Sequence, residues 1–238
     1  MESGVVNPAT VFANGIPQKV GDLNITVNSD GLVSTMTDGA ANVSFAYPRM
    51  SRANESDVII KVDDKANDEV YTVNVSLNHS GYSEYWKTVW DDGDVEDRWF
   101  EYNTDNQVKR IRISNNYVGN GTIEYSYENG NIVGVKMSPA DGGTIKLNYG
   151  NTPIKNNGGI MIFQMFGIEE TVMQYAYYAG LLGKATMSLP VKSESSFDGE
   201  TSVDIYSWTV NDKGLPTKLT TEYVDLEGSD TEDTIFEW

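Results

Sequence analysis

The sequence predicts a mainly β protein in which successive hairpins form one curved or barrel-like antiparallel sheet. Three observations predict it: apolar and polar residues alternate along several short segments, turn-forming residues separate those segments, and one segment alone has helical spacing. A chain of 238 residues suffices for one all-β unit, so we expect residues 1–238 to form a single domain.

Alternation of apolar and polar residues marks the strands. In the clearest case Tyr71, Val73, Val75 and Leu77 alternate with polar residues, which places four apolar side chains on one face of a strand. The same period recurs over residues 23–27, 123–127, 133–137 and 145–149. Each segment is expected to be a half-buried strand.

Turn residues predict how these strands pair. Asn129-Gly130 offers the two residues tolerant of positive φ that a type I′ hairpin needs, so residues 123–127 and 133–137 should pair antiparallel. Looser turn signals lie at residues 29–31, 104–106, 141–143 and 211–214, and a meander follows. The alternate positions are too polar to face lipid over a full membrane depth, and no run approaches the roughly 20 apolar residues of a spanning helix.

One segment, residues 168–182, has apolar residues spaced three or four positions apart, with two glutamates in its first turn. This predicts a helix. The side chains opposite the apolar stripe are apolar too, so the helix should be mostly buried on the concave face of the sheet; they include Met173, Tyr177 and Tyr178. Gly180 weakens the last turn, and Gly183 is expected to end the helix.

The charge balance argues against nucleic acid as a partner. Seventeen basic and 35 acidic residues give a net charge of −18, spread along the chain, which repels phosphate backbones and anionic membrane surfaces. No residue pattern indicates an enzyme either. The chain has no cysteine, and its one histidine, His79, lies in an expected turn without partners for a triad or a metal site.

Five carboxylates fall between Asp91 and Asp97 and could in principle hold calcium. Their spacing is not that of the calcium-binding helix-loop-helix motif, and a solvated hairpin turn explains them, since turns favour Asp and Gly. We therefore expect no catalytic residue, no bound metal and no cofactor.

An aromatic cluster between residues 82 and 102 is the clearest candidate for a binding surface. Rings on an exposed sheet face stack on sugars or lipids, whereas buried rings would only pack in the core. Trp86, Trp90 and Trp99 are therefore candidate ligand-contacting residues.

Several segments together resemble an uncharacterised Bacteroidetes domain described as having a porin-like fold. They are Asn14-Gly15-Ile16-Pro17-Gln18-Lys19-Val20-Gly21, Asn28-Ser29-Asp30-Gly31-Leu32-Val33, the Tyr-rich hairpins of residues 99–149, the loop of residues 156–160, and Tyr177-Tyr178-Ala179-Gly180-Leu181-Leu182-Gly183. The resemblance implies a large curved antiparallel sheet, a porin-like meander, wrapped partly around a helix. It also implies a secreted or lipid-anchored envelope protein, found outside the cell, in the periplasm or at the outer-membrane surface, whose leader has been removed; some members are labelled lipid-binding.

Three functions compete. The first is a non-enzymatic binding module for a lipid or other small apolar ligand, with Met173, Tyr177 and Tyr178 lining the pocket; the alternative for this helix is that it simply fills the core. The second is a cell-surface glycan-binding or protein-interaction module that uses exposed aromatic residues. The third, a glycoside hydrolase, needs two carboxylates facing each other in a cleft.

Overall fold

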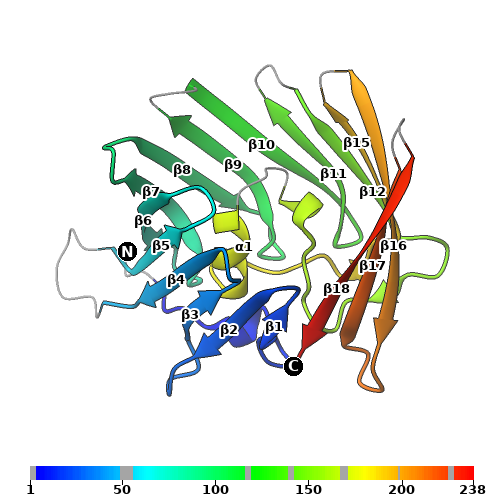
Figure 1. Ribbon diagram of the computed structural model, residues 1–238, viewed down its shortest axis with the longest axis horizontal. Helices are drawn as coiled ribbons and strands as arrows, with labels where there is room; N and C mark the ends of the chain where they lie inside the picture. The colour runs from blue at the N-terminus through cyan, green and yellow to red at the C-terminus, as the bar shows by residue number, and fades with distance from the viewer. Residues whose placement is uncertain are drawn as a thin grey trace.

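A computed structural model describes residues 4–48, 56–115, 119–138, 142–166, 171–197, 199–224 and 228–238. Within these residues sixteen strands form one closed antiparallel barrel around a central helix (Figure 1). The predicted fold class is confirmed, and the curved sheet closes: β1 pairs with β2 on one side and with β18 on the other.

The barrel strands are β1 (Lys19–Val20), β2 (Leu23–Val27), β3 (Val33–Thr37), β4 (Ala41–Ala46), β5 (Val58–Asp64), β6 (Glu69–Leu77), β7 (Ser83–Trp90), β8 (Val95–Tyr102), β9 (Val108–Asn115), β10 (Gly119–Glu128), β11 (Asn131–Ser138), β12 (Thr144–Asn148), β15 (Lys192–Phe197), β16 (Glu200–Val210), β17 (Pro216–Val224) and β18 (Ser229–Glu237). Each pairs with the next in this order. Between β12 and β15 the chain leaves the barrel wall. There it forms β13 (Ile154–Lys155), the short helix η2 (Phe163–Met165), the helix α1 (Thr171–Tyr178) and β14 (Ser188–Leu189), which pairs with β13.

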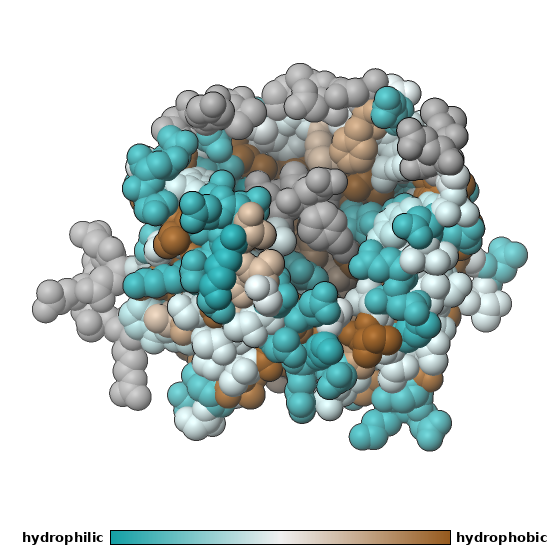
Figure 2. Space-filling model, in the orientation of Figure 1, coloured by the Kyte–Doolittle hydropathy of each residue, from teal (hydrophilic) through white to brown (hydrophobic). Residues whose placement is uncertain are grey.

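The apolar row of each strand faces the barrel interior, as β6 illustrates. Tyr71, Val73, Val75 and Leu77 are at most 7% exposed, which confirms the predicted half-buried strand. The outward rows are mainly polar, and Figure 2 shows a largely teal and white surface with isolated brown side chains. The barrel wall therefore has an apolar inside and a hydrophilic outside. No helix in the described part of the chain is long and apolar enough to cross a membrane.

The predicted hairpin at Asn129-Gly130 is confirmed. Both residues have positive φ, +52° and +74°, and β10 pairs antiparallel with β11 across them. A register shift beside Tyr127 moves the inner row of β11 by one position, so that Ile132 is 1% exposed while Val133 is half-buried. The expected row of residues 133, 135 and 137 is therefore corrected at its first member, because a β-bulge changes which side chains face inward.

The segment that leaves the wall, residues 150–191, carries α1 into the barrel interior, and we call its described interior part (residues 159–166 and 171–183) the plug. The predicted buried helix is confirmed, but it ends at Tyr178, not near residue 182. Gly180, with φ +82°, ends it in a Schellman motif, in which Leu181 N–H donates to Ala176 O (3.0 Å) and Gly180 N–H donates to Tyr177 O (2.8 Å). The predicted first turn, residues 168–170, lies outside the described residues.

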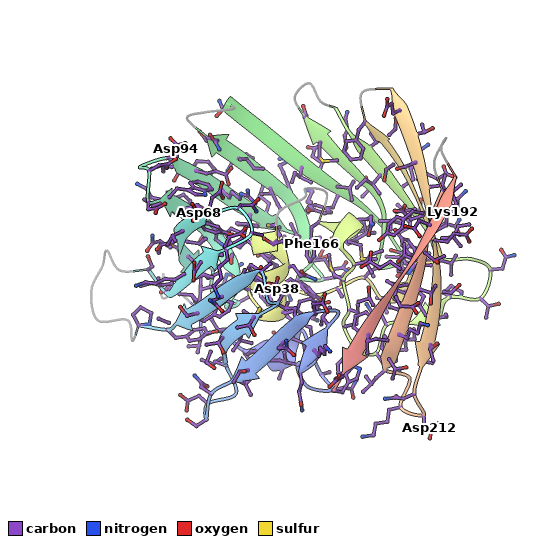
Figure 3. All side chains as sticks on the ribbon, in the orientation of Figure 1. Asp38, Asp68, Asp94, Phe166, Lys192 and Asp212 are labelled. Atoms are coloured by element: carbon purple, nitrogen blue, oxygen red, sulfur yellow. The ribbon has the colours of Figure 1, made fainter. Side chains whose placement is uncertain are left out.

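Tyrosine hydroxyls fix the plug by donating to its backbone carbonyls. Tyr125 of the wall donates to Phe166 O (2.8 Å), while Tyr177 and Tyr178 of α1 donate to Gly159 O (2.5 Å) and Met161 O (3.2 Å). Phe166 lies near the middle of the barrel in Figure 3. Each of these hydrogen bonds provides a partner for a buried hydroxyl and for a buried carbonyl, so neither group needs a water molecule as its partner.

The segment before β1 packs against the plug. It carries the short helix η1 (Pro8–Thr10), and Phe12 is 2% exposed, with its ring 5.6 Å from the ring of Tyr177 and 5.9 Å from that of Tyr178. Pro8 lies so close to Gly180 that a Cβ at residue 180 would stand 2.9 Å from the proline Cα. The N-terminal segment and the plug are therefore packed without spare volume at this point.

Candidate functional site

A cavity of about 290 Å³ lies inside the barrel between the plug and strands β1, β17 and β18. The barrel wall contributes Val20, Leu219, Thr221, Tyr223, Glu232, Thr234 and Phe236, and the plug contributes Ile160, Met161, Ile162, Gln164 and Gln174. Its volume is close to the lower end of the range for small-molecule sites, about 300 Å³. We call it the seam cavity, because β1 and β18 meet there.

Strand periodicity positions the wall side of the seam cavity. Leu219, Thr221 and Tyr223 alternate along β17, and across the strand pair Thr221 lies opposite Glu232. Because residues two apart in a strand share a face, all of them face inward. Residues at the Leu219 end are buried, whereas Tyr223 is 37% exposed and Glu232 is exposed, so the cavity reaches solvent at its Tyr223 end.

The seam cavity has an apolar end and a polar end. Val20, Leu219 and Phe236 are each at most 6% exposed and form the apolar end with the plug's Ile160 and Ile162. Tyr223, Glu232 and the two glutamines supply polar groups nearer solvent. Figure 2 shows that the upper half of this face of the molecule is hollowed, with brown side chains of the inner wall visible inside. Such a lining suits a molecule with one apolar and one polar part.

Tyr223 and Glu232 form the polar end through a hydrogen bond. The Tyr223 hydroxyl donates to Glu232 Oε2 (3.0 Å). Partial burial, the hydrogen bond to Glu232 and the nearby charges of Glu232 and Asp204 together raise the pKa of Tyr223 to about 12, with burial the largest cause. The phenol therefore stays protonated at neutral pH and its proton points to the carboxylate.

Asp204 lies next to Tyr223 on the neighbouring strand, where the two are direct Cα partners. It is 7% exposed, and its Oδ2 accepts hydrogen bonds from Ser193 Oγ (3.0 Å) and from the Tyr206 hydroxyl (3.2 Å). Asp204 is thus held within the wall and does not line the cavity, although its charge is close to it.

Gln164 and Gln174 face the cavity from the plug. Both side chains are half-buried, and neither amide hydrogen-bonds to another residue in the described ranges. Each amide can donate two hydrogen bonds and accept others, so both are available to a bound molecule.

The three candidate tryptophans lie in three different environments. Trp86 is fully buried inside the barrel, with its ring 4.6 Å from that of Phe100. Trp90 is half-buried beside Tyr71, at a ring distance of 5.8 Å. Trp99 is half-buried on the outer face, because its strand neighbours Arg98 and Phe100 face inward.

The three candidate residues of the helix are packed in the plug. Met173, Tyr177 and Tyr178 are at most 1% exposed, and the space that Met173 and Tyr177 share with the barrel wall is only about 10 Å³, room for about one water molecule. The described lining of the seam cavity contains none of the six candidate residues. A role for any of them in binding stays a prediction.

Asp91, Asp92 and Asp94 lie at the hairpin turn between β7 and β8, where Asp94 N–H donates to Asp92 Oδ1 (3.0 Å). The expected solvated turn is corrected for Glu96 and Asp97, which lie in β8: Glu96 is 5% exposed and accepts a hydrogen bond from Arg98 Nε (2.5 Å), and Asp97 accepts one from the Tyr85 hydroxyl. Figure 3 places Asp94 at the outer edge of the molecule. Among the described residues, no three His, Cys, Asp or Glu side chains are grouped closely enough to hold a metal ion.

Reasoning from sequence missed Tyr223, Glu232, Gln164 and Gln174. One signal was present in the sequence. Asp204 and Glu232 are charged residues in the inward-facing rows of their strands, because Tyr206 and Thr234, two residues further along, face the interior. A charged residue in an inward position is a departure from the apolar row that indicates either a buried network or a site.

Comparison with known proteins gives one family and a set of similar folds. A family model described as "Domain of unknown function (DUF4595) with porin-like fold" matches residues 56–218. A crystal structure of a porin-like protein from Bacteroides uniformis is similar at 17% identity and a TM-score of 0.65, covering 90% of this chain and 87% of that one. A porin-like protein from Bacteroides vulgatus is similar at 14% identity and a TM-score of 0.60, covering 93% and 98%. No curated protein matches.

Proposed function

We propose a binding function for this chain, which belongs to the DUF4595 family of domains of unknown function with a porin-like fold. The barrel holds a small amphipathic molecule, such as a lipid, in the seam cavity. The resemblance to a Bacteroidetes domain with a porin-like fold is confirmed, and the family carries no known activity to transfer. The proposal therefore rests on the cavity itself.

The observation that carries the proposal is the two-ended lining of the seam cavity. Its apolar end would remove a hydrocarbon segment from water, at about 0.8 kcal/mol for each buried CH₂ group. Its polar end, with Tyr223, Glu232 and the amides of Gln164 and Gln174, would meet a head group that remains near solvent.

A binding role without catalysis agrees with the carboxylates at the site. Glycoside hydrolysis ordinarily needs two carboxylates flanking the substrate. In the described lining Glu232 is the single carboxylate, while Asp204 is buried and hydrogen-bonded to two hydroxyls. The hydrophilic outer wall suits a protein surrounded by water, and we place it in the secreted, periplasmic or outer-membrane-surface fraction.

Two neighbouring threonines of β17 offer a matched test. Thr221 faces the cavity and is 5% exposed, whereas Thr220 lies on the outer face, where its hydroxyl bonds to Asp233. Titration with the uncharged probe N-phenyl-1-naphthylamine should show binding by the wild type and by Thr220→Phe, and loss of binding by Thr221→Phe. Equal binding by all three proteins would place the probe elsewhere and contradict the proposal. Native mass spectrometry of gently purified protein would identify a co-purified molecule.

A second function, glycan binding, is favoured by the outer face of β7 and β8. The rings of Tyr85 and Trp99 lie 5.6 Å apart there, Arg112 lies 5.8 Å from the Trp99 ring, and the Tyr85 hydroxyl bonds to Asp97. Half-exposed rings beside charged hydrogen-bonding groups are typical of sugar-binding surfaces. Retention of the wild type, but not of Trp99→Ala, in gels containing soluble polysaccharides would support this function; equal mobility of both proteins in every gel would remove it.

A further inference from the structure

The described lining of the seam cavity carries a negative charge and no positive charge, which affects the kind of head group that the cavity accepts. Of the twelve residues that line it in the described ranges, Glu232 is the only charged one. The basic side chains of the surrounding strands point outward and are engaged there: Lys218 Nζ is 2.7 Å from Asp233, Lys192 Nζ is 2.6 Å from Glu194, and Lys19 Nζ is 3.9 Å from Glu237. Figure 3 shows Lys192 at the barrel wall, away from Phe166 at the centre.

The polar end of the cavity offers mainly hydrogen-bond acceptors. Glu232 Oε2 accepts a hydrogen bond from the Tyr223 hydroxyl, and Glu232 Oε1 has no hydrogen-bond partner among the described residues. Since the Tyr223 proton is already engaged, its oxygen presents only a lone pair to a ligand. Asp204, whose backbone is the direct neighbour of Tyr223, adds a second negative charge close to this end.

We propose that the seam cavity selects amphiphiles whose head groups are uncharged or cationic hydrogen-bond donors, and disfavours carboxylate and phosphate head groups. This inference rests on the proposed function and names the ligand class for the same site. A hydroxyl or ammonium group would donate to Glu232 Oε1 and to the Tyr223 oxygen, while its remaining polar atoms would meet the amides of Gln164 and Gln174. An anionic head group would meet the same amides but also the charge of Glu232, without a cation in the lining to offset it.

Four ligands, each with a chain of twelve carbon atoms, separate head-group charge from chain burial: monododecanoylglycerol, dodecylammonium, dodecanoate and methyl dodecanoate. Each competes with N-phenyl-1-naphthylamine below its micelle concentration, at about 0.15 M salt, where charges beyond about 8 Å are largely screened. The first two should bind, dodecanoate should bind at least about tenfold more weakly than monododecanoylglycerol, and methyl dodecanoate, which has no donor, should also be weaker.

Two glutamates of β18 give a matched control for the overall charge of the protein. Glu232→Gln should strengthen dodecanoate binding and weaken dodecylammonium binding, each by at least about tenfold, or about 1.4 kcal/mol. Glu237→Gln removes the same charge from the outer face of the same strand and should change neither. Circular dichroism would verify that both variants are folded.

Three outcomes have distinct meanings. Dodecanoate binding as tight as that of monododecanoylglycerol would overturn the head-group inference and leave the proposed function standing. Equal effects of Glu232→Gln and Glu237→Gln would also overturn it, because the discrimination would then come from net charge. Binding of none of the four ligands to the wild type would refute the proposed function, and the head-group inference with it.

Discussion

The tyrosines that fix the plug make the fold sensitive to alkaline pH. Tyr125, Tyr177 and Tyr178 are buried and donate to plug carbonyls, and Tyr149 of the wall donates to Ile132 O (2.7 Å). Burial raises the pKa of Tyr149 to about 12 and raises the pKa of the other three further above the ordinary value. Each must stay protonated for the native packing to persist.

The sign and size of the effect follow from linkage between protonation and folding. In the unfolded chain these tyrosines have pKa values near 10, so folding retains protons that the unfolded chain releases above that pH. Their stabilisation is fully present below pH 10 and is lost as the pH rises through the folded pKa. At about pH 11 each tyrosine with a raised pKa contributes about 1.4 kcal/mol less to the free energy of unfolding, and the four together contribute about 6 kcal/mol less. That is comparable with the whole stability of an ordinary domain, about 5–15 kcal/mol.

A pH titration followed by tyrosinate absorbance and by far-ultraviolet circular dichroism checks this. The buried tyrosines should ionise together with the loss of β structure, in one transition between about pH 10 and pH 12. Tyr178→Phe should lower the dependence of unfolding free energy on pH by one proton, about 1.4 kcal/mol per pH unit in that window. Ionisation of all tyrosines near pH 10 with the circular dichroism unchanged would refute the burial argument.

Two further predictions concern packing, and a third concerns an exposed ion pair. Gly180→Ala should destabilise the fold by about 2–4 kcal/mol in urea unfolding, because positive φ and contact with the N-terminal turn both oppose a Cβ; Gly39→Ala, with positive φ but open space, should cost about 1 kcal/mol. Phe12→Ala should cost about 3–5 kcal/mol by the same measurement, since its ring fills the space beside two plug tyrosines, and a smaller loss would mean that the N-terminal segment packs loosely. Lys218→Ala should leave the unfolding midpoint unchanged, because its ion pair is exposed, while the pKa of Asp233, now held low by hydrogen bonds from Lys218 and Thr220, should rise on NMR titration.

Local pattern was enough to predict several of the strands. The row from Tyr71 to Leu77 faces inward as alternation requires, and Asn129-Gly130 turns the chain as its backbone freedom allows. Closure of the sheet into a barrel could not be predicted from local sequence. The strand β1 has only two residues, Lys19 and Val20, and they pair with β18 at the other end of the chain. The end of the helix was misplaced because two glycines competed, and Gly180 comes first along the chain.

The candidate site was harder to predict because its residues come from separate parts of the chain. Gln164 and Gln174 carry no local signal, since a glutamine in a mainly apolar segment is equally compatible with a solvent-facing position. Tyr223 and Glu232 become neighbours only through the register of β17 and β18. The aromatic residues were chosen as candidates because large rings often contact ligands. Trp86 and Tyr177 are instead buried in well-packed surroundings, where large rings contribute most to stability.

The position of the plug in the chain constrains the order in which the molecule folds. The plug is the middle of the connection between β12 and β15, so hairpins on both sides of it can form from local contacts and then curve around it. The pairing of β1 with β18 joins distant residues through two residue pairs, and its loop-closure entropy is offset only when most of the chain is already ordered. We therefore expect seam closure to be the last and slowest step of folding, with the plug serving as the nucleus around which the two halves of the chain wrap.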